Sequence, residues 1–316
     1  MNYRNNSSFS REYPMLQIAW DATSLGKLKT CPRKYFYELV QGWQTRKESV
    51  HLTFGKALHA ALEIYDKERA KENDHKTAQR KTLTAALEWC GGYDENEVYR
   101  KWQSEDKYKG PYTLLRSILW YTELHKDDQA QTVILRDGTP AVELQFQFAL
   151  PEFYAPDGNE YILCGHIDRI VDFCGQLWIM DRKTTKSTLY EGFFESFTPD
   201  NQMSMYSLAG HIVFQQDVKG VMVDGIQIAI NFSEFMRGFA YRTNDMLEEW
   251  LADTKAWIKF AEHYAIEGRW PQNDSVCGLY GGCSYRSICG KDPAVRNAFL
   301  ASNFRQRTWD PIAGGE

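Results

Sequence analysis

The segment from residue 164 to residue 186, CGHIDRIVDFCGQLWIMDRKTTK, constrains the fold more than any other part of the sequence. Two mostly apolar runs flank Cys174 and Gly175, which predicts two strands joined by a two-residue turn, because glycine accepts a positive φ. In such a hairpin the numbers of paired residues have a constant sum. Asp168 and Asp181 are therefore expected to face each other, with Cα atoms about 4.5–5.5 Å apart.

Opposed carboxylates repel each other unless a cation or a shared proton lies between them. An oxygen-rich site with open positions suits Mg²⁺ or Mn²⁺. Lys183 stands two residues beyond Asp181 and is expected on the same face of the strand. The hairpin alone leaves a second interpretation open, in which two solvated acids end the strands and one of them is bridged to Lys183.

The composition is that of a globular protein. The chain has 316 residues, 43% of them hydrophobic, and a formal net charge of −5, so no overall positive field indicates a nucleic-acid partner. The N-terminus has no apolar signal core, and no run of 18 apolar residues occurs, so we expect an intracellular, cytoplasmic protein without a membrane span. Seven cysteines in that setting argue against a disulfide framework.

Hydrophobic periodicity predicts an α/β fold, a mixed central sheet flanked by helices. Alternation favours strands over 140–150, on both sides of the turn at 174–175, over 220–232 and over 235–243. Helical spacing favours helices over 54–72, 200–216 and 244–268, and two helices within 21–40 separated by a break at Cys31-Pro32. Residues 74–135 add two or three further helices, which we interpret as a helical insertion.

Gly165 and Asp168, the hairpin, and then Asp181 and Lys183 match a known pattern position by position. They resemble motifs II and III of the PD-(D/E)XK nuclease superfamily in its RecB-like branch, where G-x-x-D is followed by a hairpin and (D/E)-x-K. The resemblance implies a restriction-endonuclease-like core in which Asp168 and Asp181 hold the metal. Arg182 stands where an aromatic residue is common, and the family uses the backbone carbonyl of this position as a further ligand.

Three further features fall in the order of that branch. His59 in FGKALH occupies the position at which the branch has a metal-binding histidine. An imidazole ligand shifts the metal preference of an oxygen-rich site toward Mn²⁺. Gln202 and Tyr206 in QMSMY match its Q-x-x-x-Y motif, which orients the lysine and the substrate phosphate. Glu143 lies on the polar face of the 140–150 strand, where the superfamily often carries an acid. A helix-face histidine, a surface glutamine beside a core tyrosine and a solvated glutamate are the structural alternatives.

Four cysteines form a second constellation. Cys277, Cys283 and Cys289 are separated by five residues each, and Cys31 lies far upstream. They resemble the 4Fe-4S site of AddB-type and CRISPR-associated RecB-like nucleases, in which four thiolates staple an N-terminal helix to the C-terminal segment. The first five-residue gap departs from the family's shorter one. A structural Zn²⁺ is the main alternative, although the C-x₂₋₄-C pairs typical of zinc are absent.

Other cysteines and aromatic residues have simpler expectations. Cys90, Cys164 and Cys174 have no partners at useful spacing and are expected to be buried and inert. The aromatic residues at 35–37 and 43 either offer stacking surfaces to a single strand or pack in the core.

The resemblance implies an organisation of four segments within one integrated domain. Residues 1–20 form a loose arm, 21–135 a helical region with the first cluster cysteine and the motif histidine, 136–268 the nuclease core, and 269–316 the iron-sulfur segment and tail.

The implied activity is metal-dependent hydrolysis of DNA phosphodiesters, with Lys183 orienting or deprotonating the attacking water. The expected enzyme is an exonuclease on single-stranded DNA ends in recombination, repair or processing, with a helicase or recombination protein as a partner. One alternative is a catalytically inactive, nuclease-like scaffold that binds DNA or a helicase. A redox protein is another, but no flavin or nicotinamide fingerprint supports it.

Overall fold

The computed structural model describes residues 8–46, 49–91, 102, 106–214 and 217–312; residues 1–7 of the expected arm lie outside this set. The chain forms two compact units, each built from separate stretches of sequence. Unit 1 comprises Met1–Lys47, Gln145–His166 and Thr243–Glu316, and unit 2 comprises Glu48–Leu144 and Ile167–Arg242. All residues expected at the metal site belong to unit 2, and the four cluster cysteines belong to unit 1.

Unit 2 contains a mixed sheet covered by helices, which confirms the predicted fold class. Strands β5 and β6 pair antiparallel, β6 and β7 parallel, and β7 and β8 antiparallel, while β3 pairs antiparallel with β5. The elements are α3 (Val50–Ala70), α4 (His75–Trp89), α5 (Pro111–Leu124), β3 (Gln131–Thr132), β6 (Gln176–Thr185), α6 (Glu191–Glu195), α7 (Asn201–Phe214), β7 (Val218–Ile228) and β8 (Ser233–Tyr241), with parts of β4 (Val142–Tyr154) and β5 (Glu160–Phe173).

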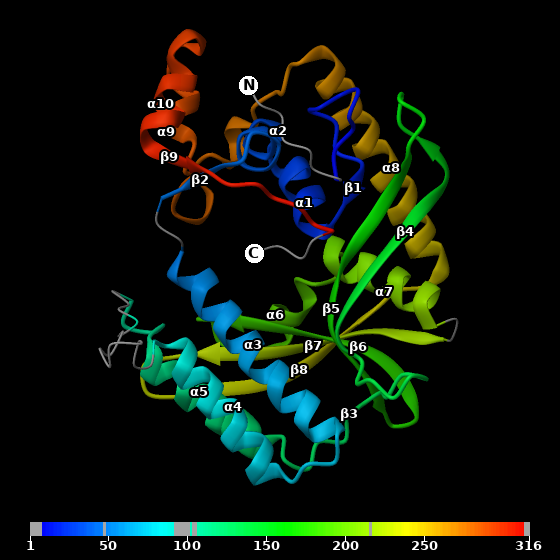
Figure 1. Cartoon of the computed structure of the whole chain (residues 1–316), viewed down its shortest axis with the longest axis vertical. Coiled ribbons are helices and arrows are strands. Elements are labelled where there is room, and N and C mark those ends of the chain that lie inside the picture. Colours follow the sequence, from blue (N-terminus) through cyan, green and yellow to red (C-terminus); the bar gives the residue numbers. More distant parts are fainter. Residues whose placement is uncertain (1–7, 47–48, 92–101, 103–105, 215–216, 313–316) are drawn as a thin grey trace. The chain divides into compact units, whose positions relative to one another are not determined.

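Helices α3, α4 and α5 lie side by side in unit 2 (Figure 1). The predicted stripe on α3 is confirmed, because Leu58, Leu62 and Tyr65 are all buried. Leu58 and Leu62 pack with Ile118 of α5 and Ile226 of β7 in one apolar cluster. Burial of apolar surface at about 25 cal/mol per Å² is the main force that holds such helices against a sheet.

The hairpin at 174–175 has the predicted register. Cys174 and Gly175 have φ values of 55° and 75°, as a two-residue turn with two left-handed positions requires. The paired residues run from Phe173↔Gln176 to Arg169↔Met180. The ladder thus stops one pair before the two acids, which were expected to be directly paired. Cys174 is exposed in the turn, so the expectation that it is buried is wrong, whereas Cys90 and Cys164 are buried.

Unit 1 is mainly helical, and its helices begin and end at the predicted signals. Asp21 forms a capping box with Ser24, Pro32 opens α2, and Gly268 ends α8 in the left-handed conformation. The elements are β1 (Ala19–Trp20), α1 (Ala22–Thr30), α2 (Pro32–Tyr35), η1 (Phe36–Val40), β2 (Trp43–Thr45), α8 (Asn244–Glu267), η2 (Asp274–Val276), η3 (Leu279–Gly281), α9 (Arg286–Cys289), η4 (Pro293–Val295), α10 (Arg296–Asn303) and β9 (Phe304–Gln306), with parts of β4 and β5.

Residues 8–20 are not a loose arm. Leu16 and Trp20 are fully buried, and Ala19–Trp20 pairs in parallel with Ile162 and Leu163 of β5. The short run LQIAW therefore supplies core side chains despite its polar neighbours. The aromatic residues that follow also pack in the core: Tyr35 is fully buried and stacks on Trp20 with ring centroids 5.7 Å apart. Within the described ranges, no helix combines the length and the apolar character that a bilayer span requires.

Gly220 lies at an irregularity between β6 and β7. The register shifts between Leu177 and Ile179 on β6, opposite Val218 and Val221 on β7. Gly220, between those two positions on β7, has a φ of 146°, and a Cβ built on it would lie 2.5 Å from the carbonyl oxygen of Ala240 on β8. Only glycine fits here without displacing backbone atoms.

Replacing Gly220 with alanine is therefore expected to lower the free energy of unfolding by about 2–4 kcal/mol, through backbone strain and a steric clash. Gly138→Ala is the matched control, because Gly138 has a φ of 84° but no atom within 4 Å of its built Cβ. It should lose only about 1 kcal/mol. Urea unfolding measures both, and equal losses would contradict the role assigned to Gly220.

Candidate active site

The two predicted acids lie where β5 and β6 separate. The Oδ2 atom of Asp168 accepts a hydrogen bond from the backbone N–H of Arg182 at 3.0 Å. In a continued ladder that N–H would bond to the β5 backbone, so a side chain takes over the link between the strands. The same oxygen lies 3.3 Å from Nδ1 of His59 on α3. The structure thus brings an acid from each strand and the predicted histidine to one place.

The two carboxyl groups have different electrostatic surroundings. Burial raises the pKa of Asp168, but the hydrogen bonds and charge from His59, the Arg182 N–H and the Lys183 ammonium outweigh it, and the pKa lies below its ordinary value. Burial also raises the pKa of Asp181; Lys183 opposes this, Asp168 adds to it, and the pKa ends above its ordinary value. The negative charge of Asp168 therefore makes the ionisation of Asp181 less favourable, as expected of two acids that lie close together.

A line of contacts leads from Asp181 to helix α7. The Nζ atom of Lys183 lies 2.7 Å from Oδ2 of Asp181 and donates a hydrogen bond of 2.7 Å to Oε1 of Gln202. Gln202 in turn donates to the hydroxyl of Tyr206 at 2.8 Å. Burial lowers the pKa of Lys183, but the attraction of Asp181 outweighs it and raises the pKa above its ordinary value. Lys183 is therefore an ammonium ion held in a fixed direction.

Asp200 is a residue of this site that the sequence analysis missed. Its Oδ1 atom accepts hydrogen bonds from the backbone N–H groups of Gln202 and Met203, at 2.8 and 3.0 Å, as an N-cap does. Its charge also raises the pKa of Lys183. Asp200 is the first residue of the helix predicted over 200–216, and the observed helix begins one residue later, at Asn201. The N-cap preference for aspartate was the signal that could have identified Asp200.

Glu143 also lies within electrostatic range of the acids. Burial, followed by the negative charges of Asp168 and of Glu63 on α3, raises the pKa of Glu143 to about 7. Its backbone is left-handed, with a φ of 54°, a conformation that is uncommon for a residue other than glycine. Glu63 stands one helical turn after His59, on the same side of α3, and was not predicted.

The donor set has the chemistry that a divalent cation requires. Oδ2 of Asp181 is buried, and its ion-pair partner is Lys183 at 2.7 Å. Two carboxylates and an imidazole are donor types that suit Mg²⁺ or Mn²⁺. Within the described residues, however, no group of three or more His, Cys, Asp or Glu side chains is arranged so that it could hold a metal ion.

A protein-family model described as the PD-(D/E)XK nuclease superfamily matches residues 19–290, which is most of the chain. The chain belongs to the PD-(D/E)XK nuclease superfamily. We therefore expect the protein to be an enzyme that hydrolyses nucleic acids. A comparison with curated proteins found no match.

Two solved structures are similar to this superfamily member. One is a "putative exonuclease" from Eubacterium rectale, with 10% identity, a TM-score of 0.49, and 94% of this chain and 98% of that chain covered. The other is SSO0001, with 13% identity, a TM-score of 0.35, and 87% of each chain covered. We infer no activity from either similarity.

In this PD-(D/E)XK protein, the four predicted cluster cysteines line one cavity of about 200 Å³ in unit 1. Burial raises the pKa of Cys289, Arg33 lowers it, and the thiols of Cys31 and Cys283 raise it, so these groups lie within electrostatic range of one another. The backbone N–H of Cys283 donates to the carbonyl of Cys277 at 3.0 Å. The structure thus brings the four cysteines, which come from two distant parts of the sequence, to one cavity.

Addition of Mn²⁺ is expected to raise the thermal midpoint of the wild-type protein, since a cation that binds only the folded state stabilises it by about 2.7 kcal/mol at 100 times its Kd. Asp181→Asn should abolish the increase, because it removes one of the two candidate metal-binding carboxylates. Asp217→Asn, at a carboxylate 71% exposed, should keep it. A wild type that Mn²⁺ does not stabilise would contradict a metal site here.

Proposed function

We propose that this PD-(D/E)XK protein is a divalent-metal-dependent DNA nuclease, and that it acts as an exonuclease on single-stranded ends. The observation that carries the proposal is the continuous set of contacts in unit 2, in which Asp181 holds Lys183, Lys183 binds Gln202, and Gln202 binds Tyr206. Asp168 and His59 stand beside this set. Such a set places two acids and one fixed positive charge around a small space.

Asp168 and Asp181 would hold the cation, with His59, the carbonyl of Arg182 and Glu143 as further donors. A bound Mg²⁺ or Mn²⁺ would supply an activated water and neutralise charge on the phosphate. In the hydrolysis, the water oxygen forms a bond to phosphorus, the bond to the leaving oxygen breaks, and a proton from water ends on that leaving oxygen. The protein fixes the positions of these groups before the reaction begins.

Lys183 would stabilise charge in this proposal. Its Nζ atom is held between Asp181 and Gln202, so the ammonium group can donate a hydrogen bond to the phosphate or to the attacking water. Gln202 holds the ammonium in place, and Tyr206 orients the amide of Gln202. These contacts support the interpretation of the Q-x-x-x-Y pattern as one that orients the lysine.

Positive side chains near the end of β6 favour a polyanionic substrate. Lys109 is only 4% exposed, lies over the ring of Phe54 at 5.4 Å, and forms no ion pair with a described carboxylate. Burial and then the positive charge of Lys186 lower the pKa of Lys109, and burial and then the charge of Lys109 lower that of His51. A phosphate group near these residues would relieve their mutual repulsion.

The four cysteines support a second part of the proposal, a 4Fe-4S cluster held by Cys31, Cys277, Cys283 and Cys289. A cluster would join α1 and α2 to the C-terminal segment of unit 1, and its role would be structural. A Cys₄ zinc site is the alternative. The proposed setting is the processing of DNA ends in recombination or repair. The sequence contains no helicase P-loop, so a partner would unwind the duplex.

Asp181→Ala and Lys183→Ala are each expected to reduce cleavage of end-labelled single-stranded DNA by about 10³-fold or more, because each removes a group that stabilises the transition state. The assay compares Mn²⁺, Mg²⁺ and chelator, and circular dichroism checks the fold of each variant. Lys219→Ala, a surface lysine paired with Asp217 on unit 2, is the control and should cleave normally. A wild type that binds DNA but never cleaves it would favour the inactive scaffold.

Anaerobic purification is expected to give a brown protein with about four iron and four sulfide per chain. Cys283→Ala should lose the visible absorbance and much of the stability, while Cys174→Asn should keep both, because Cys174 lies in the hairpin turn and outside the lining of the cavity. A colourless wild type containing one zinc per chain would replace the cluster with the zinc site.

A further inference from the structure

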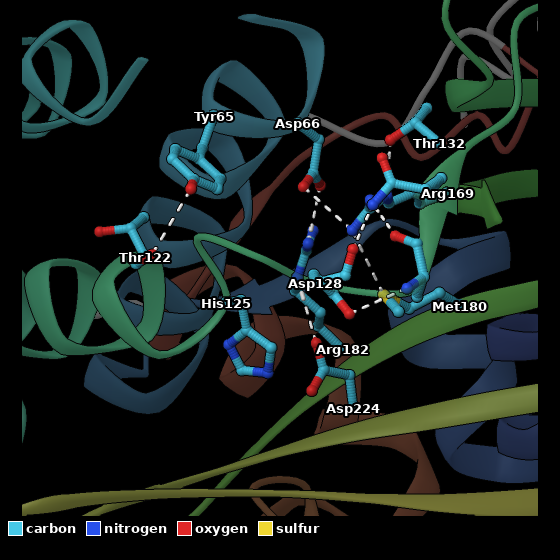
Figure 2. Close-up of polar contacts among 12 residues, drawn as sticks. Tyr65, Asp66, Thr122, His125, Asp128, Thr132, Arg169, Met180, Arg182 and Asp224 are labelled. Atoms are coloured by element: carbon cyan, nitrogen blue, oxygen red, sulfur yellow. Dashed lines mark hydrogen bonds and ion pairs between the residues drawn. The ribbon is translucent and has the colours of Figure 1, made fainter. Parts of the chain in front are cut away.

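Unit 2 contains a row of six side chains that alternate in charge, four of them buried and two half-buried. Arg169 and Arg182 both form ion pairs with Asp66 of α3, and Arg182 also forms an ion pair with Asp224 of β7 (Figure 2). Beyond Asp224, the row continues through Arg237 of β8 to Asp128, with N···O distances of 3.5 and 2.6 Å. In chain order the six members are Asp66, Asp128, Arg169, Arg182, Asp224 and Arg237.

Asp66 has a special place in this row, because it binds the residues that follow both candidate metal-binding acids. Its Oδ1 atom lies 3.2 Å from Arg169, the neighbour of Asp168, and its Oδ2 atom lies 2.7 Å from Arg182, the neighbour of Asp181. One carboxylate thus ties β5 to β6 next to the point where their backbone ladder ends. The side chains of Asp66 and Arg182 are each 3% exposed, so water does not screen this contact.

The same helix carries the third candidate ligand. His59 precedes Asp66 by seven residues, or two helical turns, so the two side chains leave α3 on the same side. His59 contacts Asp168 while Asp66 contacts both arginines. A shift of Asp66 relative to β5 and β6 would therefore change the separation of all three candidate ligands.

We propose that Asp66 is a positioning residue that sets the separation of Asp168 and Asp181 and so determines the affinity of the site for a divalent cation. This inference rests on the proposed metal-dependent function. The physical reason is that a buried carboxylate shared by two guanidinium groups has a narrow range of geometries. An amide at this position would leave Arg169 without this carboxylate partner and Arg182 with only the longer contact to Asp224. Groups that orient metal ligands in this way commonly change the affinity for the metal when they are removed.

The other end of the row offers a matched control. Asp128 forms two hydrogen bonds with Arg237, at 2.7 and 2.6 Å, and its side chain is 13% exposed. Arg237 lies on β8, two strands from β6 and three strands from β5 in the order of pairing, and is not adjacent in sequence to a candidate ligand. Asp66 and Asp128 also line the same cavity of about 230 Å³. Replacement of either residue with asparagine therefore removes one negative charge from the same row. Only Asp66, however, contacts the residues that follow the two candidate metal-binding acids.

Isothermal titration of the full chain with Mn²⁺ tests the proposal. Asp66→Asn is expected to raise the Kd for Mn²⁺ about 10- to 100-fold, while Asp128→Asn stays within about threefold of the wild type. Both variants are expected to have a lower thermal midpoint. An Asp66→Asn protein with the wild-type Kd, or an Asp128→Asn protein with the same increase in Kd, would overturn the positioning role.

A second variant covers the case in which Asp66→Asn does not fold. Arg169→Gln removes the link from Asp66 to β5 and keeps the link to Arg182, so it should also raise the Kd for Mn²⁺; an unchanged Kd would overturn the proposal. Failure of the proposed function is recognised separately, because the wild type itself would then bind no Mn²⁺ and cleave no DNA. Wild-type binding with unchanged affinity in the variants would reject only the role of Asp66.

Discussion

Two negative charges buried at the end of a hairpin ladder are the constraint on which unit 2 depends. The negative charge of Asp168 is balanced by contacts with His59 and with the N–H of Arg182. The negative charge of Asp181 is balanced by the ammonium group of Lys183. These partners come from α3 and β6, and Gln202 of α7 in turn binds Lys183, so these elements must meet at one point. An apolar pair at the same place would place no such demand on the helices.

Much of this arrangement can be predicted from the sequence, because it follows from short-range rules. The alternation of apolar residues and the glycine at 175 determine the strands and the register, and the register brings Asp168 and Asp181 to adjacent ends. The spacing between Gln202 and Tyr206 places both side chains on one side of a helix, and the structure shows them in contact. Helix ends at Pro32 and Gly268 follow from local backbone preferences in the same way.

The parts that the sequence did not reveal depend on contacts between distant segments. Periodicity indicates which side of a strand a residue faces, but not which partner lies there. The sequence therefore assigned a role only to the backbone carbonyl of Arg182, whereas the structure shows that its guanidinium group binds Asp66. Trp20 was assigned to a loose arm because only the pairing of β1 with β5 buries it. The early end of the hairpin ladder has no local signal either, since it depends on Asp168 taking the Arg182 N–H.

The row of six alternating charges has a consequence for how the sequence can change over time. A single substitution within it leaves a charge without its neighbour, but simultaneous replacement of several members by apolar residues of similar volume can leave a protein equally stable. The positions of Asp66, Arg182 and Asp224 are therefore expected to vary as a block among relatives. An apolar or aromatic residue at 182 would be accompanied by loss of the acids at 66 and 224, a correlated change that comparisons of single positions would overlook.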